Sequence, residues 1–269
     1  LSRGEKLAAL AAALRAAVAQ RNLFDVPVKV GDRLATVVIE RLVREASKGM
    51  TLQMSEGLTG RSGRALEGVS ATLSDGGNSI NGAPIRFALR RGAGLEPTVV
   101  DTVDSIASLP ATTLWGTRAA LTAGLALDVL AGVARSDHAW LRGRYNASLR
   151  GLRGATSIRL EPLPVALRGQ VPGNLLEGLK ENLGLRITSS PEWVVSGSLD
   201  DLGCKDLSMR RSCKVSGAVQ MREIAGSRRA VSLTMTRRGT HSDDVLASAQ
   251  AERRLIKRLA KALAERLAQ

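Results

Sequence analysis

The chain has 269 residues, which is longer than one typical domain and leads us to expect two. Hydrophobic residues make up 44% of it, so it can bury real cores and is not disordered as a whole. Aromatic residues amount to only 2%, which argues against proteins that read single-stranded nucleic acid by stacking bases on aromatic rings. The net charge of +14 favours anionic partners, although a composition rich in arginine, alanine and glycine is also what GC-rich coding produces.

The amino-terminal part combines helical and extended patterns. Apolar residues recur every three or four positions over residues 3–20 and 34–47, which predicts two helices. Alternating apolar and polar residues over 84–90 predict a half-buried strand, and residues 50–58 are a further strand candidate.

Two more segments of this part, residues 99–109 and 113–134, favour helices. The second contains the most apolar stretch of the chain, but charged residues interrupt it, whereas a membrane span needs about 20 uninterrupted apolar residues. We therefore expect no transmembrane segment. Residues 135–154 are rich in arginine, glycine and serine, and we place a domain boundary there, near Gly151.

The carboxy-terminal part has a clearer pattern. Residues 157–167 are predicted to be extended, and residues 174–183 to form a helix that Gly184 ends. Three strand-like segments then predict a meander: residues 193–199, 214–222 and 229–236. Ser242-Asp243-Asp244 is predicted to cap a long helix that runs to the end of the chain.

These elements predict the fold class α/β (α+β) with two domains. Residues 1–150 form an amino-terminal α/β domain of unknown type. Residues 151–269 form a small mixed sheet with a three-strand meander, packed by two helices.

Cys204 and Cys213 are the only cysteines, and they lie in a polar segment between two predicted strands. This arrangement predicts one disulfide across a hairpin loop, worth about 2–3 kcal/mol in the chain-entropy model. A disulfide indicates an oxidising compartment, hence the periplasm or the exterior, whereas the alternative is two free thiols in a cytosolic loop. We expect no metal there, because no histidine or further cysteine close in sequence completes a ligand set.

The last helix is the most amphipathic segment, and basic residues gather on one side of it: Arg253, Arg254, Lys257, Arg258 and Lys261. One interpretation is a surface for anionic partners or a membrane interface, and the other, which we favour, is the solvated face of a packed helix. The candidate surface for an anionic partner combines residues of this helix with arginines of nearby segments: Arg228, Arg229, Arg237, Arg238, Arg253, Arg254, Lys257 and Arg258.

The sequence contains no nucleophile elbow, zinc-protease motif or phosphate-binding loop. His241-Ser242-Asp243 has the residue types of a catalytic triad, but the predicted helix cap explains Ser242 and Asp243. We therefore predict no catalytic residue, no cofactor and no enzymatic activity. An enzyme whose groups meet only in the folded chain stays open as an alternative, with four candidate residues: Asp101, Asp104, Asp128 and His138.

Gly60-Arg61-Ser62-Gly63 has the form of the basic loop with which KH domains clamp a nucleic-acid backbone. The segment before it looks extended rather than helical, and Gly68 weakens a helix after it, so we favour a glycine-rich turn. A nucleic-acid-binding protein that uses this loop and the arginine-rich surface is nevertheless the main alternative function.

The carboxy-terminal part also resembles a known family. A helix over residues 174–183, a short strand over 186–188, a break at Pro191 and the strand Trp193-Val194-Val195-Ser196-Gly197-Ser198-Leu199 follow one another. This order is similar to the α/β domain shared by the TolB amino-terminal domain, the curli-export lipoprotein CsgG and the penicillin-binding-protein activator LpoB. The resemblance covers residues 157–269, with a shorter stretch from the helix to Gly197 and a cysteine segment that the family pattern lacks.

The resemblance implies a cell-envelope protein that docks to partners and has no chemistry of its own. We therefore expect a periplasmic or outer-membrane-associated accessory protein, an assembly factor that binds another protein. Anionic lipid or glycan is the next partner class, and nucleic acid ranks below both.

Overall fold

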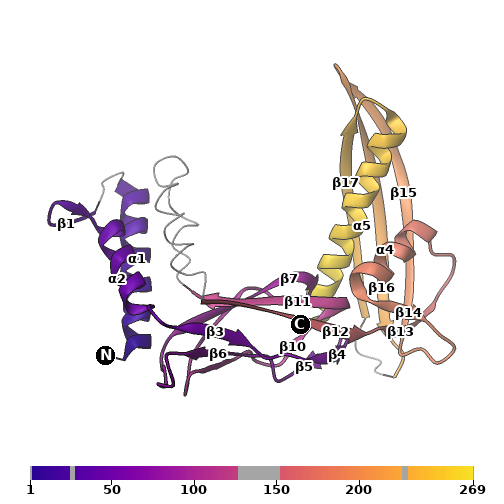
Figure 1. Ribbon diagram of the computed structural model, residues 1–269. Helices are drawn as coiled ribbons and strands as arrows, with labels where there is room; N and C mark the ends of the chain where they lie inside the picture. Colours follow the sequence, from indigo (N-terminus) through magenta and orange to yellow (C-terminus); the bar gives the residue numbers. More distant parts are fainter. Residues whose placement is uncertain (1, 25–27, 127–151, 226–229, 269) are drawn as a thin grey trace.

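The computed structural model describes residues 2–24, 28–126, 152–225 and 230–268 (Figure 1). The molecule is elongated, with two helices at one end, a region of strands in the middle and a second α/β unit at the other end. Among the described helices, none combines the length and the apolar character that a membrane crossing needs.

The amino-terminal part contains the helices α1 (Arg3–Phe24) and α2 (Ala35–Ala46), both predicted. Its strands are β1 (Lys29–Val30), β2 (Arg33–Leu34), β3 (Thr51–Met54), β4 (Thr59–Arg61), β5 (Ala65–Leu66), β6 (Ser70–Ser74), β7 (Pro84–Ala93), β8 (Thr98–Asp101), β9 (Ile106–Ser108), β10 (Thr112–Thr113), β11 (Trp115–Leu125) and β12 (Arg153–Glu161). The two larger sheets have the orders β4-β12-β11-β7-β8 and β3-β6-β9. One hydrophobic core joins them, with Phe87, Leu121 and Leu73 among its fully buried residues.

The two later helices predicted for this part are wrong. Residues 99–109 contain most of β8 and all of β9, and the described portion of residues 113–134 is mostly the strand β11, while residues 127–134 lie outside the described residues. In β11 burial alternates, with Ala119, Leu121, Ala123 and Leu125 inside. An apolar run of alanine and leucine suits either a buried helix or a central strand, and here pairing with β7 on one side and β12 on the other decides for the strand.

The carboxy-terminal part contains α4 (Gly173–Leu183) and α5 (Asp244–Ala268). Its strands are β13 (Leu163–Leu167), β14 (Leu185–Ile187), β15 (Trp193–Leu207), β16 (Arg210–Glu223) and β17 (Ala230–His241), in the sheet order β14-β13-β15-β16-β17. The pairs β15–β16 and β16–β17 are antiparallel, which confirms the predicted three-strand meander, and β13 runs parallel to both of its neighbours.

Both helices of this part cover the same face of the sheet. Leu175 of α4 lies against Gly197 of β15, and Leu255 and Leu259 of α5 lie against Gly217 of β16, where a side chain would collide with them. Apolar residues of both helices and of the sheet form a second hydrophobic core. The opposite face of the sheet carries no described helix, and we call it the helix-free face (Figure 1). The α/β fold class is therefore confirmed.

The sheets change after β12. This strand pairs with β11 in the amino-terminal part, and the next strand, β13, belongs to the second sheet. The cores change at the same place, since Leu160 lies in the first and Leu163 in the second. The division into two domains near Gly151 stays a prediction, because Gly151 itself lies outside the described residues.

Candidate partner-binding site

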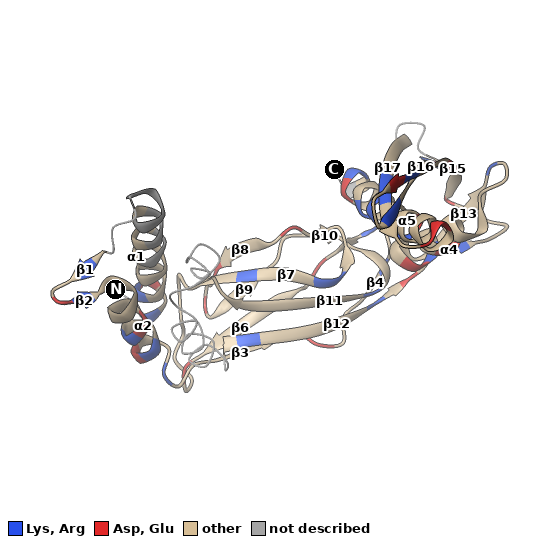
Figure 2. Ribbon diagram, turned by 90° about the horizontal axis from the view of Figure 1, so that it is seen from above, with Lys and Arg blue, Asp and Glu red and all other residues tan. Residues whose placement is uncertain are grey.

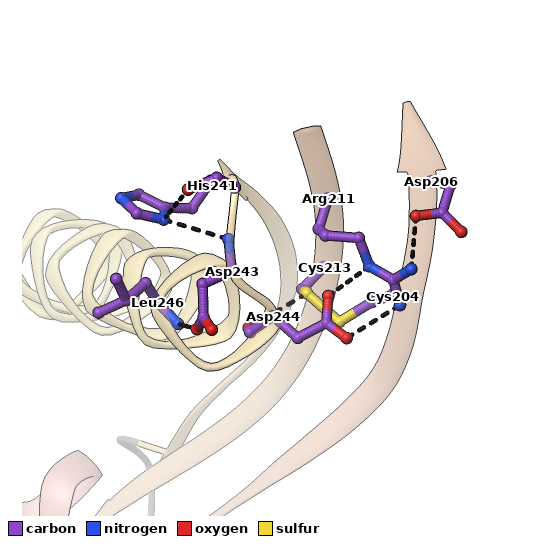
Figure 3. A network of polar contacts seen from close by, with 9 residues as sticks. Cys204, Asp206, Arg211, Cys213, His241, Asp243, Asp244 and Leu246 are labelled. Carbon is purple, nitrogen blue, oxygen red and sulfur yellow. Dashed lines mark hydrogen bonds and ion pairs between the residues drawn. A yellow bond between two sulfur atoms is a disulfide. The ribbon is translucent and has the colours of Figure 1, made fainter. Parts of the chain in front are cut away.

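Cys204 and Cys213 form the predicted disulfide, but not in a loop (Figure 3). The strands β15 and β16 continue through both cysteines as far as Leu207 and Arg210, and the two cysteines are direct partners in the ladder. A register shift between Asp201 and Cys204 lets the strands continue beyond the predicted ends. The bond therefore ties together two paired strands near the end of a long hairpin.

An arginine next to the disulfide connects this hairpin to the start of α5 (Figure 3). Arg211 donates hydrogen bonds to Asp244 and Asp206, one of them from Nη2 to Asp244 Oδ2 at 2.9 Å. These hydrogen bonds raise the pKa of Arg211. Cys204, Cys213 and Asp244 lie close enough to suggest a metal site, but both sulfur atoms are used in the disulfide and cannot serve as thiolate ligands.

The residues with the letters of a triad form a helix cap. Asp243 Oδ1 accepts a hydrogen bond of 3.0 Å from the backbone N–H of Leu246, which confirms the predicted cap of α5. His241 Nδ1 lies 3.3 Å from Ser242 Oγ and 3.3 Å from the backbone N of Asp243. The Asp243 carboxylate thus binds the helix terminus and does not orient the imidazole, as a triad requires.

The residues of the enzyme alternative are not seen to converge. Asp101 and Asp104 are both exposed, and the backbone N–H of Asp104 donates to Asn81 Oδ1 at 2.6 Å. Asp128 and His138 lie outside the described residues.

The glycine-rich segment Gly60-Arg61-Ser62-Gly63 connects the two parts of the molecule. Ser62 is fully buried, and its Oγ donates to the Leu183 carbonyl at 2.5 Å and accepts from the Gly116 N–H at 3.1 Å. Gly63 has a φ of +75° and lies so close to the Trp115 ring that a Cβ would come within 2.8 Å of it. Only glycine meets both conditions at low cost.

Arg61 of this segment and Arg64, which directly follows it, also bind within the chain. Arg61 and Arg64 contact the two carboxylate oxygens of Glu192 at 2.7 and 3.0 Å. Partial burial acts to raise the pKa of Glu192, but the hydrogen bonds and charges of Arg64 and Arg61 outweigh it and hold the pKa below its usual value. The segment turns between β4 and β5, so no helix follows it as in a KH domain, and its basic groups hold the two parts together.

The structure divides the described residues of the candidate anionic-partner surface between the two faces of the sheet. Arg228 and Arg229 lie outside the described residues. Arg237 and Arg238 are neighbours in β17 and point to opposite faces, with Arg237 on the side of α5 and Arg238 on the helix-free face. The four candidate residues that α5 contributes are all exposed: Arg253, Arg254, Lys257 and Arg258.

Three of these basic residues line a groove of about 370 Å³ beside the outer edge of β17, which we call the basic groove. Its lining residues are His241, Leu246, Gln250, Arg253, Arg254 and Lys257. Gln250 Oε1 accepts a hydrogen bond of 2.9 Å from the backbone N–H of Thr240, so the groove follows the line where α5 meets the strand. Figure 2 shows Lys and Arg residues on both α5 and β17. The described lining contains two arginines and one lysine and no acidic residue.

A smaller cavity of about 180 Å³ continues the basic lining toward the amino-terminal part. Lys257 lines both cavities, and the smaller one adds Lys261 of α5, Arg91 of β7 and Arg118 of β11, with Glu181 as an acidic neighbour. Sequence reasoning missed Arg91 and Arg118, because no local pattern shows that β7 and β11 lie beside α5.

No family model and no curated protein matches the chain. Among the solved structures that resemble part of it are two with 14% sequence identity and a TM-score of 0.31 each. One is a protein of Caulobacter crescentus CB15 described as a lipoprotein, with 39% of this chain and 87% of that chain covered. The other is a minor lipoprotein from Acinetobacter baumannii, with 40% and 92% covered. A likeness of this size carries no functional conclusion, and the resemblance to TolB, CsgG and LpoB stays a prediction.

Proposed function

We propose that this chain is a non-catalytic accessory protein of the cell envelope, periplasmic or associated with the outer membrane, which binds an acidic segment of another protein in the basic groove. The observation that carries the proposal is the groove itself, where Arg253, Arg254 and Lys257 line a concave surface without an acidic neighbour among its described lining residues. Clefts lined by one sign of charge attract and orient partners of the opposite sign.

The fold supports binding because the basic residues of the groove belong to α5, which is packed firmly against the sheet. The apolar side of α5 is buried, with Leu255, Leu259 and Leu263 fully inside the second core. The arginines therefore project from a helix that cannot rotate, and their guanidinium groups can form paired hydrogen bonds with carboxylates. The disulfide and the Arg211 contacts hold the first turn of α5 against the hairpin.

A protein segment fits this site better than a membrane surface does. A bilayer surface is flat on this scale, so it cannot enter a concave groove, whereas a single extended chain can. The nucleic-acid alternative loses its motif, because Arg61 and Arg64 bind Glu192 and Ser62 is buried.

The envelope location rests on the disulfide. Two strands held by a disulfide are typical of proteins that fold in an oxidising compartment, and cytosolic proteins rarely keep such bonds. The resemblance of residues 157–269 to envelope proteins agrees with this location but does not establish it.

A peptide titration tests the proposal. The probe is a fluorescein-labelled decapeptide of alternating glutamate and valine, and fluorescence anisotropy measures its binding to the whole chain. We expect the triple variant Arg253→Glu, Arg254→Glu, Lys257→Glu to bind at least about tenfold more weakly, since each lost cation contributes about 0.5–1 kcal/mol.

The matched control carries the same change of charge on the helix-free face: Arg186→Glu, Lys214→Glu and Arg222→Glu, all at exposed positions. We expect it to bind within about twofold of the wild type. Equal losses in both triple variants, or unchanged binding in the groove variant, would show that the groove is not the site. A DNA duplex that binds more tightly than the acidic peptide would favour the nucleic-acid alternative instead.

A further inference from the structure

Among the described residues, β17 has no strand on its outer side. It is the last strand of the five-stranded sheet and pairs with β16 along its whole length, from Ala230↔Arg222 to His241↔Arg211, without a register shift. In such a pair, alternate residues direct both N–H and C=O toward the neighbour, and the residues between them direct both groups outward.

One hydrogen bond shows which residues face outward. The Thr240 N–H donates to Gln250 Oε1 of α5 at 2.9 Å and not to β16. The alternation then assigns the same outward direction to the residues spaced by two along the strand: Arg238, Thr236, Thr234 and Ser232. The Thr236 carbonyl agrees with this, since it accepts a hydrogen bond of 3.2 Å from Arg237 Nη1.

The helix α5 extends over this edge. Gly239 of β17 touches the helix backbone, and a Cβ there would come within 2.0 Å of the Ala247 carbonyl oxygen. Leu246, next to Ala247, is followed at intervals of four residues by Gln250 and Arg254, so the three side chains lie on one side of α5. The hydrogen bond between Gln250 and Thr240 shows that this side faces the edge of β17. An extended chain beside β17 would therefore lie in the basic groove, with every second side chain directed toward the cations of α5.

We propose that the partner binds by strand addition. A segment with acidic residues at alternate positions pairs with β17 between Ser232 and Arg238, and its carboxylates contact Arg253, Arg254 and Lys257. This inference rests on the proposed function and adds how the partner binds. Such binding obtains affinity from main-chain hydrogen bonds and specificity from alternate side chains.

The charge of β17 argues against a second copy of the same strand as the occupant. This strand contains Arg237 and Arg238 and no acidic residue, so two copies side by side would place like charges together. The added strand cannot pair with β17 as far as Thr240, because the N–H of Thr240 already donates to Gln250.

The variant Thr234→Pro tests the pairing. Thr234 is exposed on the helix-free face, and its outward N–H makes no bond to β16, so proline removes a hydrogen bond to the added strand and none of the native ladder. We expect the alternating glutamate–valine peptide to bind at least about tenfold more weakly to this variant. The control Thr234→Val keeps the N–H, and its affinity should stay within twofold of the wild type.

A modified peptide gives a second readout with the unchanged protein. Methyl groups on alternate backbone nitrogens of the peptide block its pairing along one side, and we expect one of the two possible methylation patterns to abolish binding. Strand addition is wrong if both methylated peptides bind like the unmodified peptide and Thr234→Pro binds like Thr234→Val. If the groove triple variant still binds the peptide weakly in that case, the proposed function stands. If the unmodified peptide does not bind the wild type, both proposals fail. A dimer that Thr234→Pro dissociates would identify a second copy as the occupant and overturn the acidic partner.

Discussion

Replacing Ser62 by alanine removes a hydroxyl group that serves both parts of the molecule. Its Oγ satisfies the Leu183 carbonyl at the end of α4 and the Gly116 N–H at the bulge of β11, both at a fully buried position. In the variant, neither group has a partner, and each buried unsatisfied group costs about 1–3 kcal/mol. We expect Ser62→Ala to lower the free energy of unfolding by about 2–4 kcal/mol.

Urea unfolding followed by circular dichroism measures this change. The midpoint should fall while the slope m stays constant, or the transition should separate into two steps because the contact between the parts has weakened. Ser198→Ala is the matched control, since Ser198 is exposed on β15 and should change stability by less than about 0.5 kcal/mol. A Ser62→Ala variant as stable as this control would refute the assignment of Ser62 as the link between the parts.

Three further predictions concern the same framework. Gly184 has a φ of +63°, and a Cβ there would lie 2.3 Å from the Gly116 carbonyl oxygen. An alanine in the left-handed region costs about 1–2 kcal/mol, so Gly184→Ala should lower the free energy of unfolding by more than this amount. Gly169 has a φ of +72° and open space around it, so Gly169→Ala should lower the free energy of unfolding by only about 1–2 kcal/mol in the same assay. Because the pKa of Glu192 is lowered in the folded state, its pairing stabilises the protein above the unfolded pKa, and this contribution disappears as the pH falls through the lower folded value. Glu192→Gln should thus be less stable than the wild type at pH 7, by less than about 1 kcal/mol, and this difference should shrink as the pH falls below the unfolded pKa; a difference that grows in acid would contradict this. The double variant Cys204→Ser, Cys213→Ser should have a free energy of unfolding about 2–3 kcal/mol lower than the wild type. A reductant should destabilise the wild type but not this variant. Free thiols in the natively isolated protein would contradict an oxidising compartment.

The sequence was most informative where local chemistry decides the structure. Asp243 directly precedes the amphipathic run of α5 and caps it as expected, and three strand-like segments predicted the meander. Two cysteines with no other cysteine in the chain left a single intramolecular pair to consider. In each case the signal lies within a few residues of the feature that it predicts.

Prediction failed where distant contacts decide. The segment of β11 has a composition that also suits a helix, and only its neighbours β7 and β12 make it a strand. Likewise, Ser62 and Leu183 are separated by 121 positions, so no local pattern distinguishes a link between two parts from a nucleic-acid loop. The basic residues of α5 were visible in the sequence, but their position above the free edge of β17 follows from Gln250 and Gly239, which carry no such signal by themselves.

Amide exchange, residue by residue, tests the central claim most directly. The protein labelled with ¹⁵N is compared with and without the alternating glutamate–valine peptide, and protection of the individual N–H groups of β17 is measured by nuclear magnetic resonance. We expect slower exchange at Thr234, Thr236 and Arg238, whose N–H groups point outward, and little change at Leu233 and Met235, which already bind β16. Protection confined to β14 at the opposite edge, or a bound peptide that leaves the outward amides of β17 exchanging as before, would contradict the account.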